Sequence, residues 1–501
     1  EASDLGSWFL DVDGDGYGAG EARAGCEPAS NEVAVDGDCD DEDSEAFPEA
    51  EETWYDGVDQ DCLGDDDFDA DADGWTLDVD CDDEEPAVHP DAEEVCGDDI
   101  DNDCDGGAPN CGLFGDLDLN DGVLWQGQSA NWAGWSLAAE GGRVLVGQPQ
   151  LAGGAGGVSL LDTPLDGGAL SPVSGPESGS WFGFSVVWCD LDGDGDADAY
   201  GGATNWDDSR GAIYGLSTGL GARVLEGEAN YGDLGATMAC GDLDGDGLDD
   251  LVSGAPGVEN NGGALRILTA SGELDVGGGE GKFGEGLAVR DVDGDGVDDL
   301  LAGARSVEHN GVATGAAYLV LGPVGSGDIA DADVRYNGDK DGDKAGFRVE
   351  AGDMDGDGSA DDVVVGALAG ERVYVAFDGH TLGPHFSLVS SDVVVQGTAT
   401  KAFTGQSLVV ADLDGDDVDD LVVGAPGADD NRGAIYVLYG PLSGSLELPG
   451  AEQAFVDGAG LEAYAAFSLA ADDLDGDGYP ELLVGGSGEN RVWILTGGAG
   501  L

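Results

Sequence analysis

The second half of the chain repeats a unit of about 50 to 60 residues, and this repeat constrains the fold more than any other feature. Each unit opens with aromatic and small residues such as Phe182–Ser185 and continues into a loop with Asp at alternate positions, as in Asp190–Asp198. An apolar run ending in Gly-Ala-Pro follows, as in Leu421–Pro426, and then a segment such as Gly433–Val437. Short apolar runs between Gly-rich turns are typical of many short strands. The repeat therefore predicts an all-β architecture.

Seven units can be recognised in this half of the chain. Six carry the Asp loop, which begins at Asp190, Asp242, Asp291, Asp353, Asp412 and Asp473. The seventh comes first in the sequence, at Trp132–Leu137, Arg143–Pro149 and Gly157–Leu160. Its loop is reduced to Glu140–Gly142, so we expect this unit to bind no metal ion. Small sheets that cannot bury both faces alone pack radially around a central channel, and we predict a seven-bladed β-propeller over residues 112–501.

The last unit has no residues left for an outer strand, because the chain stops soon after Arg491–Leu495. Val123–Gln128 resembles the outer-strand segments of other units, such as Val224–Glu228 and Val394–Gly397. An open ring would present an exposed strand edge. We therefore predict that residues 119–129 form the closing strand of the last blade.

The Asp loops have the composition of calcium sites, because Ca²⁺ takes about six to eight oxygen ligands and a short loop must point several carboxylates inward. In Asp242–Asp250, positions one, three and five, the carbonyl of Leu248 and the last carboxylate supply such a set. An EF-hand begins in the same way but needs Glu at position twelve, before a helix. Position twelve is Ser253, within an apolar run. Metal-free Asp turns are the alternative, but four converging carboxylates without a cation would repel one another.

These units resemble FG-GAP repeats, the blades of the integrin alpha-subunit propeller and of many bacterial surface proteins. The resemblance rests on the Asp loop, the Gly-Ala-Pro strand end and the Gly-x-x-Tyr strand, which recur in this order over roughly residues 113–501. Arg305, Leu368 and Ser487 replace the Pro in three copies, which leaves those turns undefined. The resemblance implies a propeller with calcium loops between strands, and it implies a ligand set for each loop.

Carried over onto this sequence, the predicted ligands are Asp190, Asp192, Asp194, Asp196 and Asp198; Asp242, Asp244, Asp246, Leu248 and Asp250; Asp291, Asp293, Asp295, Val297 and Asp299; Asp353, Asp355, Asp357, Ser359 and Asp361; Asp412, Asp414, Asp416, Val418 and Asp420; and Asp473, Asp475, Asp477, Tyr479 and Glu481. Two loops depart from the pattern. Asp417 replaces the Gly at position six, which strains that turn, and Glu481 replaces the closing Asp but keeps the carboxylate. About six calcium ions are expected in the propeller.

Residues 1–111 form a region of different composition, with seven of the nine Cys and little continuous apolar sequence. Two segments within it align, Asp38–Cys62 and Asp80–Cys104, and each follows an alternating-Asp stretch. They resemble the metal-binding repeats of bacterial secreted proteins (MopE-like) and, more loosely, the type-3 repeats of thrombospondin. Some relatives are linked to copper, but carboxylates with hardly any His favour calcium. The predicted ligands are Asp11, Asp13, Asp15, Asp69, Asp71 and Asp73.

We expect this region to be a small, irregular module in which calcium and disulfides replace a hydrophobic core. Cys189 and Cys240 occupy matching places in adjacent repeat units and could pair, whereas connectivity within the module stays open. Cysteine density of this kind suits an oxidising compartment, so we predict a secreted, extracellular or cell-surface protein.

The charge of the chain limits its partners. With 16 Lys+Arg against 107 Asp+Glu, the formal charge is -91, which excludes nucleic acid as a favoured partner because like charges repel. No stretch approaches the ~20 apolar residues of a membrane span, so no membrane insertion is expected. Metal cations are the natural counter-charge.

We predict an extracellular calcium-binding adhesion or interaction protein, not an enzyme, that presents a rigid propeller to a protein or glycan ligand. One alternative is a subunit of a filament or surface layer assembled head-to-tail by self-association. Another is a lectin, with Trp206 and Trp54 as candidate stacking residues. A calcium-dependent polysaccharide lyase ranks last. It needs a Lys, Arg or Tyr base beside calcium in one cleft, and the chain has only four Lys, at Lys282, Lys340, Lys344 and Lys401.

Overall fold

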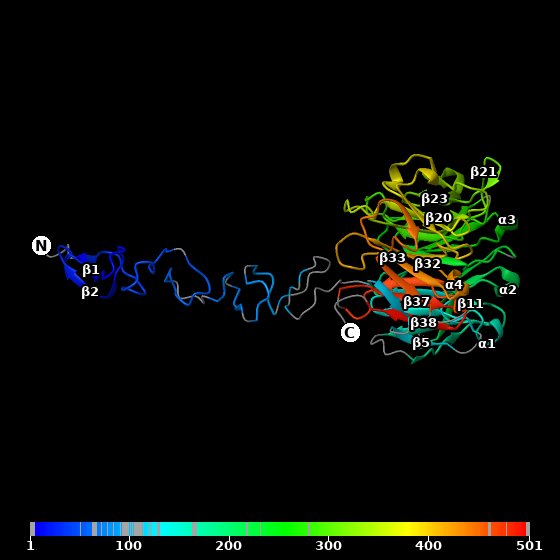
Figure 1. The fold of residues 1–501 in the computed structure, drawn as a ribbon. Coiled ribbons are helices and arrows are strands. Elements are labelled where there is room, and N and C mark those ends of the chain that lie inside the picture. Colours follow the sequence, from blue (N-terminus) through cyan, green and yellow to red (C-terminus); the bar gives the residue numbers. More distant parts are fainter. Residues whose placement is uncertain are drawn as a thin grey trace. The chain divides into compact units, whose positions relative to one another are not determined.

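The structure divides into two compact units, Glu1–Pro109 and Asn110–Leu501, and each is described by itself (Figure 1). The computed structural model describes residues 6–50, 52–62, 68–71, 73–77, 79–83, 85–90, 92, 100, 102, 104, 113, 115–119, 122–127, 131–162, 168–216, 219–230, 232–278, 281–458, 462–476 and 478–496. Strands make up 42% and helices 6% of the described residues, which confirms the all-β class. Among the described residues, no helix has the length and apolarity that a membrane crossing requires.

The first unit contains a small sheet at its start. Strand β1 (Gly6–Leu10) lies between β2 (Ala19–Gly25) and β3 (Glu32–Val33), and pairs antiparallel with both. The other described residues of this unit form turns and irregular segments, held by disulfides Cys39–Cys62 and Cys81–Cys104. Hydrogen bonds and covalent links, with few apolar contacts, therefore define its shape.

The described residues of the second unit form seven sheets of four or five strands each, and a separate hairpin of β21 (Glu308–His309) and β22 (Val312–Ala313). The first strands of the sheets are β6 (Ser136–Glu140), β11 (Phe182–Cys189), β15 (Thr237–Gly241), β19 (Leu287–Arg290), β26 (Ala345–Gly352), β31 (Ser407–Ala411) and β36 (Ser468–Asp472). The second strands are β7 (Arg143–Gly147), β12 (Asp198–Ala203), β16 (Asp250–Gly254), β20 (Asp299–Ala304), β27 (Asp362–Ala367), β32 (Asp420–Ala425) and β37 (Glu481–Gly486).

The outer strands complete each sheet. The third strands are β8 (Gly157–Asp162), β13 (Ala212–Leu216), β17 (Ala264–Thr269), β23 (Ala316–Val320), β28 (Arg372–Ala376), β33 (Ala434–Leu438) and β38 (Arg491–Leu495). The fourth strands are β10 (Val173–Ser174), β14 (Leu220–Glu226), β18 (Gly272–Gly277), β25 (Val334–Asn337), β30 (Val393–Gly397), β35 (Ala454–Asp457) and β5 (Val123–Gln126). Five sheets gain a parallel fifth strand, namely β24 (Gly327–Asp328), β29 (His385–Ser387), β34 (Gly444–Leu448), β4 (Gly115–Asp118) and β9 (Gly168–Ala169).

The first strands contact one another in sequence order, from β6 to β11 and onward to β36, and β36 in turn contacts β6. The apolar core follows the same cycle, because each buried cluster lies between two neighbouring sheets. One cluster packs Val422 of the sixth sheet against Trp493 of the seventh, and the next packs Val492 of the seventh against Val144 of the first. The seven sheets therefore form a continuous ring of contacts among the described residues.

Two strands from the beginning of the second unit complete sheets built at its end. Strand β5 pairs antiparallel with β38, with Trp125 opposite Val492, and β4 pairs in parallel with β35. Strand β5 lies within residues 119–129, the predicted closing strand of the last blade, whereas β4, which completes the neighbouring sheet, was not predicted. The two ends of this unit are thus joined through main-chain hydrogen bonds.

Short helical turns follow the second strand in four sheets and share an unusual backbone. They are α1 (Leu151–Gly154), α2 (Trp206–Ser209), α3 (Val258–Asn261) and α4 (Ala428–Asn431). The two central residues of each have positive φ, as in Asp207 at 47° and Asp208 at 57°. Other single turns are η1 (Ile329–Asp331), η2 (Gly379–Thr381) and η3 (Leu388–Ser390). The left-handed turns lie at the opposite strand ends from the Asp loops, because those loops connect the first and second strands.

Candidate metal centres

In six sheets the Asp loop connects the first strand to the second, and the carboxylate at position one organises its backbone. In the loop that starts at Asp242, Oδ1 of this residue accepts hydrogen bonds from the N–H groups of Gly245 at 2.8 Å and Asp246 at 3.1 Å, while Oδ2 accepts from Gly247 at 2.8 Å. Bonds from positions four and six recur in the loops at Asp190, Asp291, Asp353, Asp412 and Asp473. These local hydrogen bonds hold six acidic turns in one conformation.

The closing carboxylate reaches back into the loop from the start of the second strand. Asp250 Oδ2 accepts from the N–H groups of Leu243 at 3.0 Å and Asp244 at 3.1 Å, and the residue is 0% exposed. Its Oδ1 is buried and has no hydrogen-bond partner among the described residues. Burial, reinforced by the charge of Asp244, raises the pKa of Asp250 to about 7. A buried carboxylate with an unsatisfied oxygen beside further carboxylates fits a cation ligand.

The other loops repeat this closure with two variations. The equivalent carboxylates of Asp299, Asp420 and Glu481 accept from the second residue of their own loops at 2.6–2.8 Å. In the loop at Asp353, the closing group is Asp362, one residue after the predicted Asp361, because this loop is one residue longer and Asp362 pairs with Gly352 in the ladder. Asp198 occupies the equivalent position in its loop, where it pairs with Cys189 in the ladder, but its side chain is exposed.

The loop at Asp412 departs most from the others in its inner positions. Asp414 Oδ1 is buried without a hydrogen-bond partner among the described residues. Burial and then the charges of Asp416 and Asp412 raise the pKa of Asp414 to about 6. Asp417 adopts a φ of 66°, so the residue that replaces Gly here does take the left-handed conformation. This loop concentrates unsatisfied negative charge and strain in one turn.

The structure places the remaining predicted ligands within the same turns. At position seven, the N–H groups of Asp196, Leu248, Val297, Ser359 and Val418 donate to the carboxylate at position five at 2.9–3.0 Å. The predicted ligand Asp477 lies outside the described residues. Side chains at positions three and five are aligned by N–H donors, as where Asp246 donates to Asp244 Oδ1 at 3.2 Å. These residues are brought together loop by loop.

A further acidic residue, at position eight, links loops of neighbouring sheets and was missed from the sequence. Asp249 Oδ2 accepts from the N–H of Asp190, and Asp298 Oδ2 accepts from the N–H of Asp242, both at 2.9 Å. Asp419 Oδ2 accepts from the N–H of Asp353 at the same distance. The signal in the sequence is the Asp-Asp pair at positions eight and nine. One acid closes its own loop and the other holds the preceding loop.

The unit without an Asp loop has a tight hairpin instead. Gly141 and Gly142, both with positive φ, connect β6 to β7, as type I′ turns require. Arg143 then forms an ion pair with Asp196 of the following loop at 2.9 Å and stacks on Trp188 at 4.3 Å. The Arg143 guanidinium thus lies beside the connection between the first and second strands, where the other units have several carboxylates.

The first unit contains acidic turns of the same kind. Carboxylate oxygens of Asp11, Asp13 and Asp15 lie within 4.8 Å of one another, and so do those of Asp69, Asp71 and Asp73. Gly14 donates to Asp11 Oδ1 at 2.7 Å, and Gly74 donates to Asp69 Oδ2 at 3.0 Å. One oxygen of each of Asp13, Asp15, Asp69, Asp71 and Asp73 is buried without a hydrogen-bond partner among the described residues. The structure therefore brings the three carboxylates of each predicted group together, and most of them have an oxygen without a hydrogen-bond donor among the described residues.

A third acidic group in this unit was not anticipated. Oxygens of Glu52, Asp59 and Asp61 lie within 4.8 Å of one another, and the N–H of Asp61 donates to Glu52 Oε2 at 3.0 Å. These residues lie inside the loop that the Cys39–Cys62 disulfide closes. Asp59 and Asp61 stand at alternate positions in the sequence, but Glu52 joins them only once this loop is folded.

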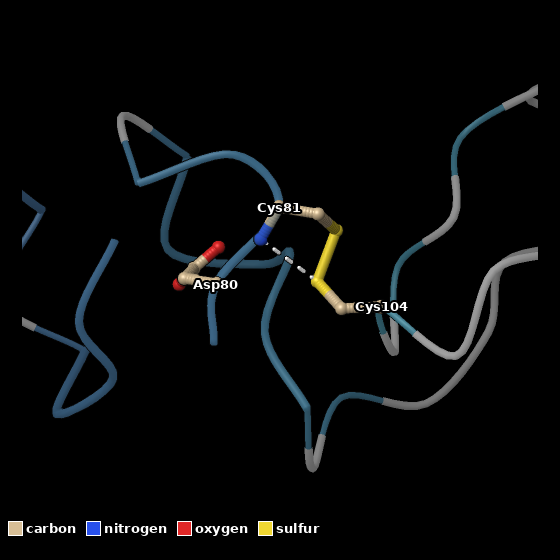
Figure 2. Close-up of side chains that lie close together, drawn as sticks. All are labelled: Asp80, Cys81 and Cys104. Atoms are coloured by element: carbon tan, nitrogen blue, oxygen red, sulfur yellow. Dashed lines mark hydrogen bonds between the residues drawn. A yellow bond between two sulfur atoms is a disulfide. The ribbon is translucent and has the colours of Figure 1, made fainter. Parts of the chain in front are cut away.

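The cysteines near the acidic groups form disulfides, which removes them as thiolate ligands. Figure 2 shows Asp80 next to the Cys81–Cys104 disulfide, with the Cys81 N–H donating to Cys104 Sγ at 3.0 Å. Cys189 and Cys240 also form a disulfide, which confirms that pairing. Cys26 is an exposed thiol, and Cys96 and Cys111 lie outside the described residues. Carboxylates are the donors that these groups offer, and oxygen donors suit calcium better than copper.

The residues named for the alternative functions have other contacts. Arg223 stacks on Trp206 at 4.5 Å, so this indole face is covered. Lys282 pairs with Glu285 at 3.6 Å, and Lys340 with Asp339 at 3.9 Å. Trp54 is half-buried in the first unit. None of these contacts, within the described residues, builds a base beside one of the Asp loops.

Comparison with known families identifies both kinds of repeat. The Cu-binding MopE family, described as "Putative metal-binding motif", matches residues 38–67 and 80–108. The family described as "FG-GAP repeat" matches residues 234–268, 283–320, 404–438 and 465–500. The chain therefore contains FG-GAP repeats and MopE-type metal-binding motifs, and both resemblances noted in the sequence are confirmed.

Curated relatives of the chain are integrin alpha chains. The chain is 30% identical to integrin alpha-PS2 of Drosophila melanogaster over 169 residues, which cover 30% of this chain and 12% of the relative. It is 32% identical to human integrin alpha-IIb over 165 residues, 30% of this chain and 15% of the relative. Integrin alpha pat-2 of Caenorhabditis elegans is 26% identical over 290 residues, 54% of this chain and 19% of the relative. The similarity is thus limited to a small part of each integrin chain.

Proposed function

We propose that the protein is an extracellular calcium-binding interaction protein, in which the seven sheets are the blades of a closed seven-bladed β-propeller. The units 1–111 and 112–501 then act as a calcium- and disulfide-stabilised module and a rigid binding platform. Its likeness to integrin alpha chains, together with its disulfides, supports an adhesion or interaction role outside the cell.

One observation carries the calcium part of the proposal. Each of six loops holds alternating carboxylates in a fixed turn, and in five of them the closing acid is buried, namely Asp250, Asp299, Asp362, Asp420 and Glu481. One oxygen of Asp250 has no hydrogen-bond partner among the described residues. Buried carboxylates are costly without compensation, so this concentration of acidic side chains supports bound cations. Calcium matches the all-oxygen donor set and the short, Gly-containing turns. About six ions in the propeller and at least two in the first unit follow from this.

Calcium content measured by mass spectrometry after equilibrium dialysis tests this part. We expect about eight or more Ca²⁺ per chain, and one fewer in Asp250→Asn. Asp208→Asn serves as the matched control, because Asp208 is exposed and lies in a left-handed turn that Asn also accepts. A chain without stoichiometric calcium would overturn the proposal.

The binding role is tested against catalysis with the calcium-loaded chain. Incubation with uronate polymers is expected to give no unsaturated product, whereas surface-coupled protein is expected to retain an extracellular protein ligand in calcium and release it in chelator. Formation of unsaturated sugars would instead assign the chain to the lyases. Retention of glycans alone on an array would favour a lectin.

A further inference from the structure

Two aspartates of the first unit, Asp38 and Asp80, are buried although the acids two residues further along are exposed. Asp38 is 8% exposed and Asp80 is 5% exposed, whereas Asp40 and Asp82, two residues further along, are exposed. Each buried Asp is the first residue of a matched metal-binding motif and directly precedes a disulfide cysteine. Burial of a carboxylate requires compensation by hydrogen bonds or a cation.

Hydrogen bonds compensate for only one oxygen of each carboxylate. Asp38 Oδ1 accepts from the N–H of Asp40, and Asp80 Oδ1 from the N–H of Asp82, both at 2.9 Å. The Oδ2 atoms of Asp38 and Asp80 are buried and have no hydrogen-bond partner among the described residues. The two sites are therefore alike in which oxygen is satisfied and which is not.

Both unsatisfied carboxylates lie beside the alternating-Asp turns. The N–H of Asp38 donates to the carbonyl of Gly18 at 3.3 Å, and the N–H of Val12 donates to Asp41 Oδ1 at 2.9 Å. These bonds bring the start of the motif against the turn that contains Asp13 and Asp15. Burial raises the pKa of Asp38, and the charges of Asp15 and Asp13 act in the same direction.

The second motif repeats these contacts. The N–H of Asp80 donates to the carbonyl of Thr76 at 2.9 Å, and the N–H of Ala70 donates to Asp83 Oδ2 at 3.2 Å. Asp83 is 3% exposed, and its Oδ1 is buried without a hydrogen-bond partner among the described residues. Burial, followed among the neighbouring charges by that of Asp73, raises the pKa of Asp80.

The equivalence is three-dimensional and does not follow from sequence spacing. The contact between the turn and the motif joins residues 29 positions apart in the first repeat and 13 apart in the second. Strands β2 and β3 occupy the additional residues in the first repeat. An aromatic residue after each turn stacks on a ring in the motif, Tyr17 on Phe47 at 5.4 Å and Trp75 on His89 at 6.3 Å. The same assembly is thus built twice from different chain lengths.

We propose that Asp38 and Asp80 are the closing ligands of two calcium sites, each shared between an alternating-Asp turn and the start of the following disulfide loop. Like Asp250 in the second unit, each is a buried acid with one oxygen that has no hydrogen-bond partner among the described residues. Because Cys39 and Cys81 come next in the chain, each ion clamps a disulfide loop onto the turn before it. The inference rests on the proposed function in that calcium is the bound ion.

Calcium stoichiometry of full-length variants tests this assignment. Asp38→Asn and Asp80→Asn are each expected to lose one Ca²⁺, and the double variant two. The exposed neighbours provide matched controls, so Asp40→Asn and Asp82→Asn are expected to keep the full number. Unchanged calcium binding in Asp38→Asn, with affinity also unchanged, would overturn the assignment.

A variant cycle separates loss of a ligand from general unfolding of the unit. Asp13→Asn combined with Asp38→Asn is expected to lose no more calcium than either change alone, because both act on one ion, whereas Asp38→Asn with Asp71→Asn is expected to lose two ions. Loss of both ions from Asp38→Asn alone would contradict separate sites. If the unmodified chain binds no calcium, the proposed function fails, whereas unaltered variants of a calcium-binding chain defeat only this inference.

Discussion

The two units contain the same acidic turn, but they surround it with different supports. In the second unit each Asp loop lies at the end of a sheet whose faces are packed in apolar clusters with residues such as Ile213 and Trp493, both 0% exposed. In the first unit the buried apolar residues among those described are Ala46 and Val88, while Val12 and Leu77 are exposed. The acidic turns thus supplement a hydrophobic core in the second unit, whereas in the first unit they take the place of such a core.

Removal of calcium is expected to produce the largest difference in stability between the two units. At a free concentration 100-fold above Kd, one ion stabilises the folded state by about 2.7 kcal/mol, and the first unit has little else. Excess chelator should unfold it while the sheets of the second unit persist. Hydrogen exchange resolved by peptide measures both units in one sample. Protection of residues 6–50 that survives chelation would contradict the contrast, and magnesium in place of calcium is the control for simple charge screening.

A substitution that creates a cavity in the apolar core tests the second unit in the same way that calcium removal tests the first. Trp493→Ala is expected to destabilise this unit by about 3 to 5 kcal/mol, because the indole is fully buried between two sheets. Exchange in the first unit should not change. Leu160→Ala provides the control, since Leu160 is 40% exposed. Equal destabilisation by both variants in urea titrations would show that the apolar clusters do not set the stability of this unit.

Removal of a disulfide from each unit is expected to give a smaller difference in stability between them. Replacement of Cys39 and Cys62 by Ser should cost about 2 to 4 kcal/mol, which in the first unit is enough to open the loop that holds Glu52. The same change at Cys189 and Cys240 should leave the second unit folded, because its sheets pack independently of this bond. The rate of proteolysis before and after each double change distinguishes the two cases. Equal susceptibility would mean that the first unit has support beyond its cross-links and ions.

The smallest effect expected concerns pH. Without calcium, burial raises the pKa of Asp250 and Asp362 to about 7 and that of Asp420 to about 8. The protonated forms stabilise the ion-free fold fully below the usual carboxyl pKa near 4, and this stabilisation is lost as the pH rises through about 7 to 8. Calcium binds the ionised form, so its effect on the Tm of the second unit should grow between about pH 5.5 and pH 8.5. A calcium effect independent of pH would contradict these burial-driven shifts.

The sequence indicated much of this arrangement because the repeat is local. The loop at Asp242 carries its spacing, its glycines and its closing acid within nine residues, and the structure brings them together in one turn. Prediction was less successful where a choice depends on register. Asp361 and Asp362 are both acids at the right distance, and only the ladder with Gly352 decides which one closes the loop.

Features that depend on long-range contacts were not visible in the sequence. In the sequence, Asp249 is only the first acid of an Asp-Asp pair. Its role depends on the neighbouring sheet, where the N–H of Asp190 donates to its side chain. Asp38 and Asp80 stand at different distances from the turns beside them, so no fixed spacing identifies them. Strand β4 is short and acidic, and its pairing with β35 follows from the position of the neighbouring sheet, not from its own composition.

The exchange of strands between the two ends of the second unit has a consequence for how the protein is made. Gln126 of β5 donates to the carbonyl of Asn490, 364 residues later in the chain. During synthesis from the N-terminus, β4 and β5 therefore emerge long before the strands they accompany, and two sheets stay incomplete until β35 and β38 have been made. Bringing such distant segments together costs chain entropy that only the finished sheets offset. A chain that stopped before β35 and β38 would leave β4 and β5 without these partners, and their unpaired edges would be accessible to proteases.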